Sequence, residues 1–309
     1  MKYKKVLVVL GGTSGERQVS LESAKACIKA LKKNGYKVST FDPQKKRYNS
    51  IDKNKVDVIF NALHGKYGED GVAQSYFECL RIPYTHSGVI SSYSAMNKII
   101  SKEIFKKNKI KSPQYFVLQK QDYNKTKLVE SIKRKRIKLP IVVKPINEGS
   151  SIGVRICKNM LDLNNSTKSL FKKYIELIYE PYIGGQEIQV AVINGEPLGA
   201  IELEPKRQFY DYKAKYLKAA KTKHIMPANI NKNKYLESLK IAKKAHKALG
   251  CKGITRSDFK FFKNQFYLLE LNTQPGMTSL SLVPEIANYK GISFEDLVEK
   301  ILLNASINR

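Results

Sequence analysis

The 309 residues of the chain, 42% of them apolar, are enough for two or three compact units with substantial cores. The formal net charge of +29 suggests a nucleic-acid ligand, but the surplus is scattered lysine with one dense run at residues 133–136, so we expect no nucleic-acid partner. Four widely spaced cysteines exclude a C-x-x-C zinc site, and no stretch approaches the ~18 apolar residues of a membrane span, so we expect a protein of the reducing cytoplasm without membrane contact.

The N-terminal part of the chain alternates strands and helices in the manner of a small parallel sheet. Residues 6–10 are all apolar, as expected of a strand covered on both faces, and residues 37–41 and 56–60 predict two further strands. A helix should begin near Ser20, a good N-cap, because apolar side chains then recur three and four positions apart. We expect this unit to end near residue 97.

A middle unit follows, with a different composition. Residues 98–107 predict a helix, residues 114–118 an extended segment, and residues 141–145 a strand that a proline limits at each end. Residues 179–183 predict a connector, because Pro181 would stop a regular element there.

The last unit opens with a strand at residues 186–193, and Asn194-Gly195 is a strong signal for a two-residue hairpin turn. Residues 206–227 are polar and rich in tyrosine and lysine without clean periodicity, which predicts a long mobile loop. The other predicted elements are a returning strand at residues 198–203, an amphipathic helix at 235–249, a hairpin at 256–272 and a closing helix at 294–303.

The hairpin at residues 256–272 carries the clearest chemical signal. If its turn centres on Asn264, Asp258 lies opposite Glu270 and Arg256 lies opposite Asn272, with all four side chains on one face. Two carboxylates and an amide oxygen are ligands that suit magnesium. A hairpin with its polar face in water is the ordinary alternative. Because the intervening residues are mostly apolar, we expect burial on both faces, and a buried acidic group then requires a cation.

A loop of small residues at 149–153 could wrap a phosphate with its backbone N–H groups, although it lacks the Walker sequence. Lys144 lies on an apolar strand upstream, a costly position for a lysine unless an anion meets it. A surface turn and a lysine that reaches solvent are equally good alternatives for each feature alone. Together with an oxygen cluster for magnesium, the two features predict a nucleoside triphosphate.

Two further motifs follow predicted strands, where open α/β sheets place ligands. One is His64-Gly65 with Gly68-Glu69-Asp70-Gly71, and the other is the loop at residues 11–17, which contains Glu16. A structural histidine and a charge at a helix N-terminus are the ordinary alternatives.

In order and spacing, these motifs resemble the D-alanine–D-alanine ligases of the ATP-grasp superfamily along nearly the whole chain. The matching segments are Gly11-Gly12-Thr13-Ser14 with Glu16-Arg17, His64-Gly65 with Gly68–Gly71, Glu148–Gly153, Tyr210-Asp211-Tyr212 with Ala214-Lys215-Tyr216, and Glu270–Thr273 with Pro275–Thr278 and Ser281-Leu282. The resemblance implies an α/β ATP-grasp fold of three domains, at residues 1–97, 98–184 and 185–309, with ATP between the central and C-terminal domains.

The resemblance also implies a reaction. ATP phosphorylates the carboxylate of one D-alanine, the amine of a second D-alanine attacks the acyl phosphate, and phosphate leaves, which yields a dipeptide for peptidoglycan precursors. Two magnesium ions, with manganese as a substitute, and a homodimeric assembly are implied as well. Members that join D-alanine to D-lactate typically carry phenylalanine at the position of Tyr216, so this chain resembles the amide-forming type. A ligase that uses D-serine and a regulatory ATP-binding protein without turnover stay open as alternatives.

The residue roles below are those that the resemblance implies. Around ATP, Lys98, Lys144, Ser150 and Ser151 serve the phosphates and the pocket, Lys215 the γ-phosphate, Glu180, Tyr182 and Ile183 the adenine edge, and Glu187 the ribose, while Asp258, Glu270 and Asn272 hold the metals. Around the amino acids, Glu16 takes the first ammonium with His64 nearby, Arg256 and the Gly276 backbone stabilise the oxyanion, Ser281 and Leu282 bind the second D-alanine's carboxylate end, and Ser150 and Tyr216 orient that substrate.

Overall fold

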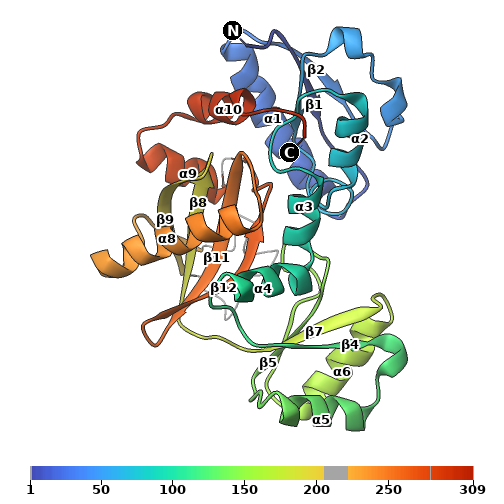
Figure 1. Ribbon diagram of the computed structural model, residues 1–309, viewed down its shortest axis with the longest axis vertical. Helices are drawn as coiled ribbons and strands as arrows, with labels where there is room; N and C mark the ends of the chain where they lie inside the picture. The colour runs from blue at the N-terminus through green and yellow to red at the C-terminus, as the bar shows by residue number, and fades with distance from the viewer. Residues whose placement is uncertain (1, 205–221, 279, 309) are drawn as a thin grey trace.

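The computed structural model describes residues 2–204, 222–278 and 280–308. Three sheets follow one another along the chain, and Figure 1 shows the N-terminal sheet at the top, the central sheet at the bottom and the C-terminal sheet between them. The predicted α/β fold is confirmed. The described residues contain no helix that is both long enough and apolar enough to cross a membrane.

The N-terminal sheet is parallel, in the order β2-β1-β3, as predicted. Its strands are β1 (Lys5–Val9), β2 (Lys37–Phe41) and β3 (Val58–Asn61), and its helices are α1 (Arg17–Lys33) and α2 (Val72–Leu80), with short 3₁₀ turns η1 (Tyr48–Ser50) and η2 (Lys53–Lys55). The predicted helix start was wrong by one turn, because α1 begins at Arg17. Ser20 is a buried residue of α1, whose hydroxyl donates to the carbonyl of Ala62 at 2.7 Å.

The central sheet is antiparallel, in the order β4-β7-β5-β6. Its strands are β4 (Phe116–Gln119), β5 (Ile141–Pro145), β6 (Arg155–Cys157) and β7 (Glu176–Pro181), with η3 (Lys120–Asp122) and the helices α5 (Lys125–Arg134) and α6 (Met160–Phe171) packed on it. The predicted connector at residues 179–183 was wrong in its first half, because β7 runs to Pro181. Pro181 is the last paired residue of β7, so its missing N–H interrupts no ladder beyond it.

The C-terminal sheet is antiparallel, in the order β10-β9-β8-β11-β12. Its strands are β8 (Gln186–Ile193), β9 (Glu196–Glu204), β10 (Lys223–Ile225), β11 (Ile254–Phe262) and β12 (Gln265–Asn272), and its helices are α8 (Lys232–Ala248) and α9 (Leu282–Tyr289). Within the predicted loop at 206–227, residues 223–225 form β10, which pairs with β9. The rest of that prediction, up to residue 221, lies outside the described residues.

Helices join the three sheets. Helices α3 (Val89–Met96) and α4 (Lys98–Lys107) lead from the N-terminal to the central sheet, and Figure 1 shows α10 (Phe294–Leu303) beside α1. Side chains of α1, α9 and α10 share one buried cluster with β8 and β9, so the N-terminal and C-terminal units have a continuous core. The Tyr3 hydroxyl also donates to the carbonyl of Ala305 at 2.9 Å.

Candidate active site

The hairpin β11–β12 brings the predicted acidic residues together. Asp258 pairs with Glu270 and Arg256 pairs with Asn272, as predicted. The turn, however, has two residues, Lys263 and Asn264, both in the left-handed region with φ of 48° and 62°.

The pairs next to the turn run from Phe262 with Gln265 to Phe259 with Leu268. Continued inward, the same register would place Asp258 opposite Leu269. A β-bulge restores the predicted register, since Leu269 is an extra residue of β12 between the pairs made by Asp258 and Phe259. Its consequence is that the adjacent residues Leu269 and Glu270 both line the same cleft. In a regular strand, neighbouring side chains point to opposite faces.

The oxygen donors of the hairpin are engaged with protein groups. Arg256 forks onto Asp258, with Nε 2.7 Å from Oδ1 and an Nη 2.9 Å from Oδ2. Asn272 Oδ1 accepts the backbone N–H of Gln274 at 2.7 Å. Among the described residues, no three His, Cys, Asp or Glu side chains converge as a complete metal site. Two carboxylates and an amide still fit magnesium, which keeps several water or phosphate ligands of its own.

A cleft of about 800 Å³, open to solvent, extends from the hairpin toward the central sheet. Of the residues predicted around ATP and metal, its lining contains Lys98, Lys144, Ser151, Glu180, Tyr182, Ile183, Glu187, Asp258 and Glu270. A second cavity of about 520 Å³ shares Lys98 and Glu270 with the cleft and adds Ser150, Arg256 and Asn272. The predicted site residues of two sheets therefore line two adjoining cavities.

We expected a nucleotide phosphate to meet Lys144, and in the structure its anionic partner is Glu180. Glu180 lies between two lysines, with Lys144 Nζ 2.9 Å from Oε2 and Lys102 Nζ 2.9 Å from Oε1. Burial alone would raise the pKa of Glu180, but the two ammonium groups, Lys102 first, hold it below its ordinary value. Lys102 is 1% exposed and was not predicted. Its only sequence signal was its place one turn after Lys98 on an amphipathic helix.

The other cationic groups of the cleft have partners too. Lys98 Nζ donates to the Glu148 carbonyl at 2.5 Å, and burial lowers the pKa of Lys98. Glu187, predicted to bind ribose, lies 3.0 Å from Lys260 Nζ. In register, Lys260 stands directly opposite Glu187, so this pair belongs to the same sheet face as Asp258.

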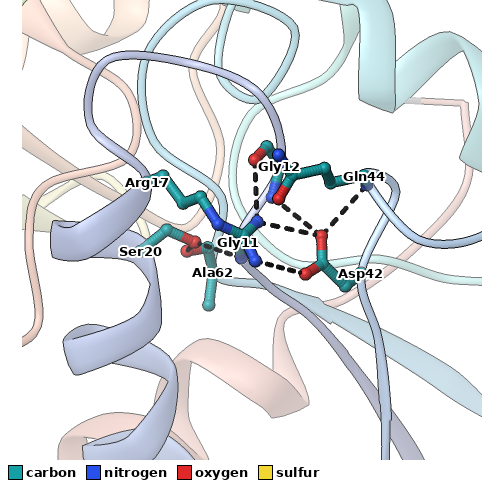
Figure 2. A network of polar contacts seen from close by, with 7 residues as sticks. All are labelled: Gly11, Gly12, Arg17, Ser20, Asp42, Gln44 and Ala62. Atoms are coloured by element: carbon teal, nitrogen blue, oxygen red, sulfur yellow. Dashed lines mark hydrogen bonds and ion pairs between the residues drawn. The ribbon is translucent and has the colours of Figure 1, made fainter.

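Glu16 lies buried at the start of α1, and the preceding loop is held firmly in place. Figure 2 shows Arg17 donating to the Gly12 carbonyl and pairing with Asp42, at 2.8 and 2.7 Å. Asp42 also accepts the Gly12 N–H, and Ser20 accepts the Gly11 N–H at 2.8 Å. This network fixes the chain on both sides of the turn that leads to Glu16.

A second buried carboxylate, Glu69, accompanies Glu16, although the sequence motif gave it no role. A Cβ atom at Gly149 would lie 3.5 Å from a carboxylate oxygen of each, so both acids flank the phosphate-type loop. Glu69 accepts the Gly65 N–H at 3.0 Å. Burial, reinforced by the nearby charge of Glu16, raises the pKa of Glu69 well above its ordinary value.

His64 connects this region with the hairpin's C-terminal loop. Its Nε2 lies 3.2 Å from Ser23 Oγ, which also accepts the Met277 N–H at 3.1 Å. Burial lowers the pKa of His64 to about 4, against a hydrogen bond with the Gln274 backbone, so the ring is neutral near pH 7.

The loop after β12 places Gly276 against Ser281. A Cβ at residue 276 would lie 2.9 Å from Ser281 Oγ, so only glycine fits without a shift. Ser281 Oγ accepts the Thr278 N–H at 2.9 Å, and Leu282 opens α9 with its side chain in the core. Lys215 and Tyr216 lie outside the described residues.

A cleft between two antiparallel sheets, lined by lysines and opposed carboxylates, is the arrangement of the ATP-grasp class. Family models for the D-ala D-ala ligase C-terminus and N-terminus match residues 104–303 and 40–87. A D-alanine–D-alanine ligase of Pelagibacter ubique is 56% identical over 310 residues, covering 99% of each chain. The chain belongs to the D-alanine–D-alanine ligase family.

Solved structures agree with this assignment. The D-alanine–D-alanine ligase of Bacillus anthracis complexed with ATP has a TM-score of 0.84 and 31% identity, over 97% of each chain. The VanG D-Ala:D-Ser ligase of Enterococcus faecalis has a TM-score of 0.83 and 26% identity, over 97% of this chain and 98% of that chain.

Proposed function

We propose that the protein uses ATP to join two D-alanine molecules to D-alanyl-D-alanine, through an acyl phosphate, with release of ADP and phosphate. The observation that carries this proposal is a pair of adjoining cavities, in a member of this family, lined by Lys98, by Lys144 and by the opposed carboxylates of the hairpin. Buried Glu16 lines a further cavity that shares Glu148 with both. The product would serve peptidoglycan precursor synthesis, which we expect in the cytoplasm.

In this proposal, ATP occupies the cleft of about 800 Å³. Glu180, Tyr182 and Ile183 take the adenine, Glu187 the ribose, and Lys98 and Lys144 the phosphates. The phosphate role of Lys144 is supported by its place in the cleft lining and by the N–H groups of its ammonium that are left after the contact with Glu180. Ser150 and Ser151 add donors from the loop, and Lys215 would reach the γ-phosphate.

Magnesium, when bound, neutralises charge on the transferring phosphoryl group. Asp258, Glu270 and Asn272 would hold two ions, with manganese as a substitute. Each oxygen of Asp258 accepts from Arg256 and keeps a further lone pair that a metal could use. Arg256 would stabilise the oxyanion of the tetrahedral intermediate.

Glu16 would bind the ammonium of the first D-alanine, with neutral His64 close by. Gly276 would stabilise the oxyanion with its backbone N–H, and Ser281 would bind the carboxylate end of the second D-alanine. The side chain of Leu282 is in the core, so its share in that carboxylate site would fall to its backbone. Ser150 and Tyr216 would orient the second substrate.

The test is release of ADP from ATP and Mg²⁺ in the presence of D-alanine. Parallel reactions contain L-alanine, D-alanine with D-lactate, or D-alanine with D-serine in place of D-alanine alone. We expect release with D-alanine alone and little with L-alanine. The absence of D-alanine-dependent release from folded protein would contradict the proposal, and a preference for the mixture with D-serine would reassign the second substrate.

The unit boundaries at residues 97/98 and 184/185 and a homodimeric assembly form part of the same proposal. The three separate sheets support a three-part division. Sedimentation equilibrium would measure the assembly, and a monomer at micromolar concentration would remove the dimer from the proposal.

A further inference from the structure

Lys102 is a buried lysine to which the proposed reaction assigns no direct role. Its side chain is 1% exposed, and Lys102 does not line the nucleotide cleft. Burial lowers its pKa, against the attraction of Glu180. A buried cation is destabilising unless it is paired and hydrogen-bonded, and the fold surrounds this one with three contacts.

Those contacts fix the ammonium of Lys102 behind Glu180. Nζ lies 2.9 Å from Glu180 Oε1, donates to the Pro113 carbonyl at 3.2 Å and sits 5.7 Å from the centre of the Tyr115 ring. Glu180 itself lines the cleft beside Pro113 and Pro181. The carboxylate is therefore held from the back by Lys102 while its front faces the ligand space.

The chemistry of a carboxylate held in this way is specific. Each carboxylate oxygen has two lone pairs, and each of the two on Glu180 lies 2.9 Å from a lysine ammonium. The remaining lone pairs accept hydrogen bonds, and an ionised carboxylate has no proton to donate. Adenine presents an amino group on its six-membered ring where guanine presents a carbonyl oxygen. A carboxylate oxygen placed against that ring position accepts from the adenine amino group and repels the guanine carbonyl oxygen.

We propose that Lys102 is a positioning residue that holds Glu180 as a fixed anionic acceptor and so makes the cleft select adenine over guanine nucleotides. The inference rests on the proposed function, because it assigns the nucleobase to the Glu180 end of the cleft. Lys144 cannot replace Lys102 in this role, since Lys144 lines the cleft and serves the ligand as well.

Removal of the Lys102 charge leaves Glu180 buried with one cation fewer. The charged and titratable groups that act on this cluster are Lys98 and Lys102 from α4, Lys144 from β5, Glu270 from β12 and Tyr115. Without Lys102, burial dominates, and the Glu180 pKa rises. The protonated carboxyl can then donate to the guanine carbonyl and no longer attracts the adenine amino group as strongly.

The experiment compares Lys102→Met with Lys106→Met, an exposed lysine one turn later on α4. For Lys102→Met, we expect kcat/KM for ATP to fall about tenfold or more, mostly through KM, while KM for D-alanine holds. The ratio of kcat/KM for ATP to that for GTP should fall by about the same factor. The KM for ATP should also rise as pH falls in this variant alone. Lys106→Met should match the wild type.

A double-mutant cycle separates this role from general support of the fold. In a Glu180→Gln background, Lys102→Met should change the ATP-to-GTP ratio no further, because the charge on which it acts is gone. Equal, additive losses for ATP and GTP would overturn the inference. Should Lys102→Met not fold, Lys102→Gln, which keeps a donor for Pro113, is measured instead with the same expected ratio. Wild-type ADP release with D-alanine tests the proposed function separately.

Discussion

Ser23 joins three parts of the site through one hydroxyl group. On α1 it is 1% exposed, it accepts the Met277 N–H at 3.1 Å and it lies 3.2 Å from His64 Nε2. The ring of His64 is neutral and its other side meets the Gln274 backbone, so the Ser23 O–H donates to Nε2. Ser23→Ala would leave a buried donor and a buried acceptor without partners.

Each buried polar group left in this state costs about 1–3 kcal/mol, so the free energy of unfolding should fall by about 2–6 kcal/mol. Since both groups flank the proposed D-alanine sites, KM for D-alanine should rise as well. The chain has no tryptophan, so urea unfolding is followed by far-ultraviolet circular dichroism. Ser75→Ala, an exposed serine of α2, is the control and should stay within about 0.5 kcal/mol of wild type. A loss below about 1 kcal/mol with unchanged KM would refute the assigned hydrogen bonds.

Three other predictions concern the hairpin and the buried acids. Glu270→Gln should abolish D-alanine-dependent ADP release while the melting temperature changes little, and near-normal activity would mean that the metal ligands are misassigned. The pKa of Glu69 is raised by burial, so the folded protein holds a proton that the unfolded chain releases, and stability falls as pH rises between the ordinary and the raised pKa. Glu69→Gln should remove that fall, which amounts to about 1.4 kcal/mol for each pH unit between the unfolded and folded pKa values. Thermal melts at pH 5 and pH 8 measure it, and a variant whose stability changes with pH as much as the wild type would contradict the prediction. Lys263→Asn should stabilise the protein by about 0.5–1 kcal/mol at unchanged activity, because asparagine tolerates the left-handed φ of 48°, and a lower unfolding midpoint would argue against it.

The sequence predicted most of the fold where periodicity was long and regular. The helices at residues 98–107 and 294–303 agree with α4 and α10 in full, and the three parallel strands lie as expected. The connector at residues 179–183 failed because Pro181 was taken as a strand breaker, although at the last position of a strand its missing N–H costs little. The helices α2, α3, α5, α6 and α9 were not predicted. Helices α5 and α6 begin after Asn124 and Asn159, whose side chains cap them, and this local signal was missed.

The candidate site was predictable where a motif joined residues that are close in the chain. The pairing of Asp258 with Glu270 was predicted from strand pairing alone. The prediction assumed a turn centred on Asn264. The turn has two residues instead, and the extra residue Leu269 restores the predicted register. Lys102 and Ser23 could not be found in this way. Each is an ordinary polar residue on a helix, and only the folded chain shows that its partners come from distant segments.

The bulge at Leu269 also separates the outer end of the hairpin from its inner end. Between the bulge and the turn, the ladder runs in its own register, and residues 262–265 at the tip are exposed. On the inner side of the bulge, Asp258 pairs with Gln189 of β8 as well as with Glu270 of β12, and this pairing sets the positions of both carboxylates. The tip is therefore a suitable place to graft a peptide tag or a fluorescent reporter, which would project from the molecule while the opposed carboxylates keep their spacing.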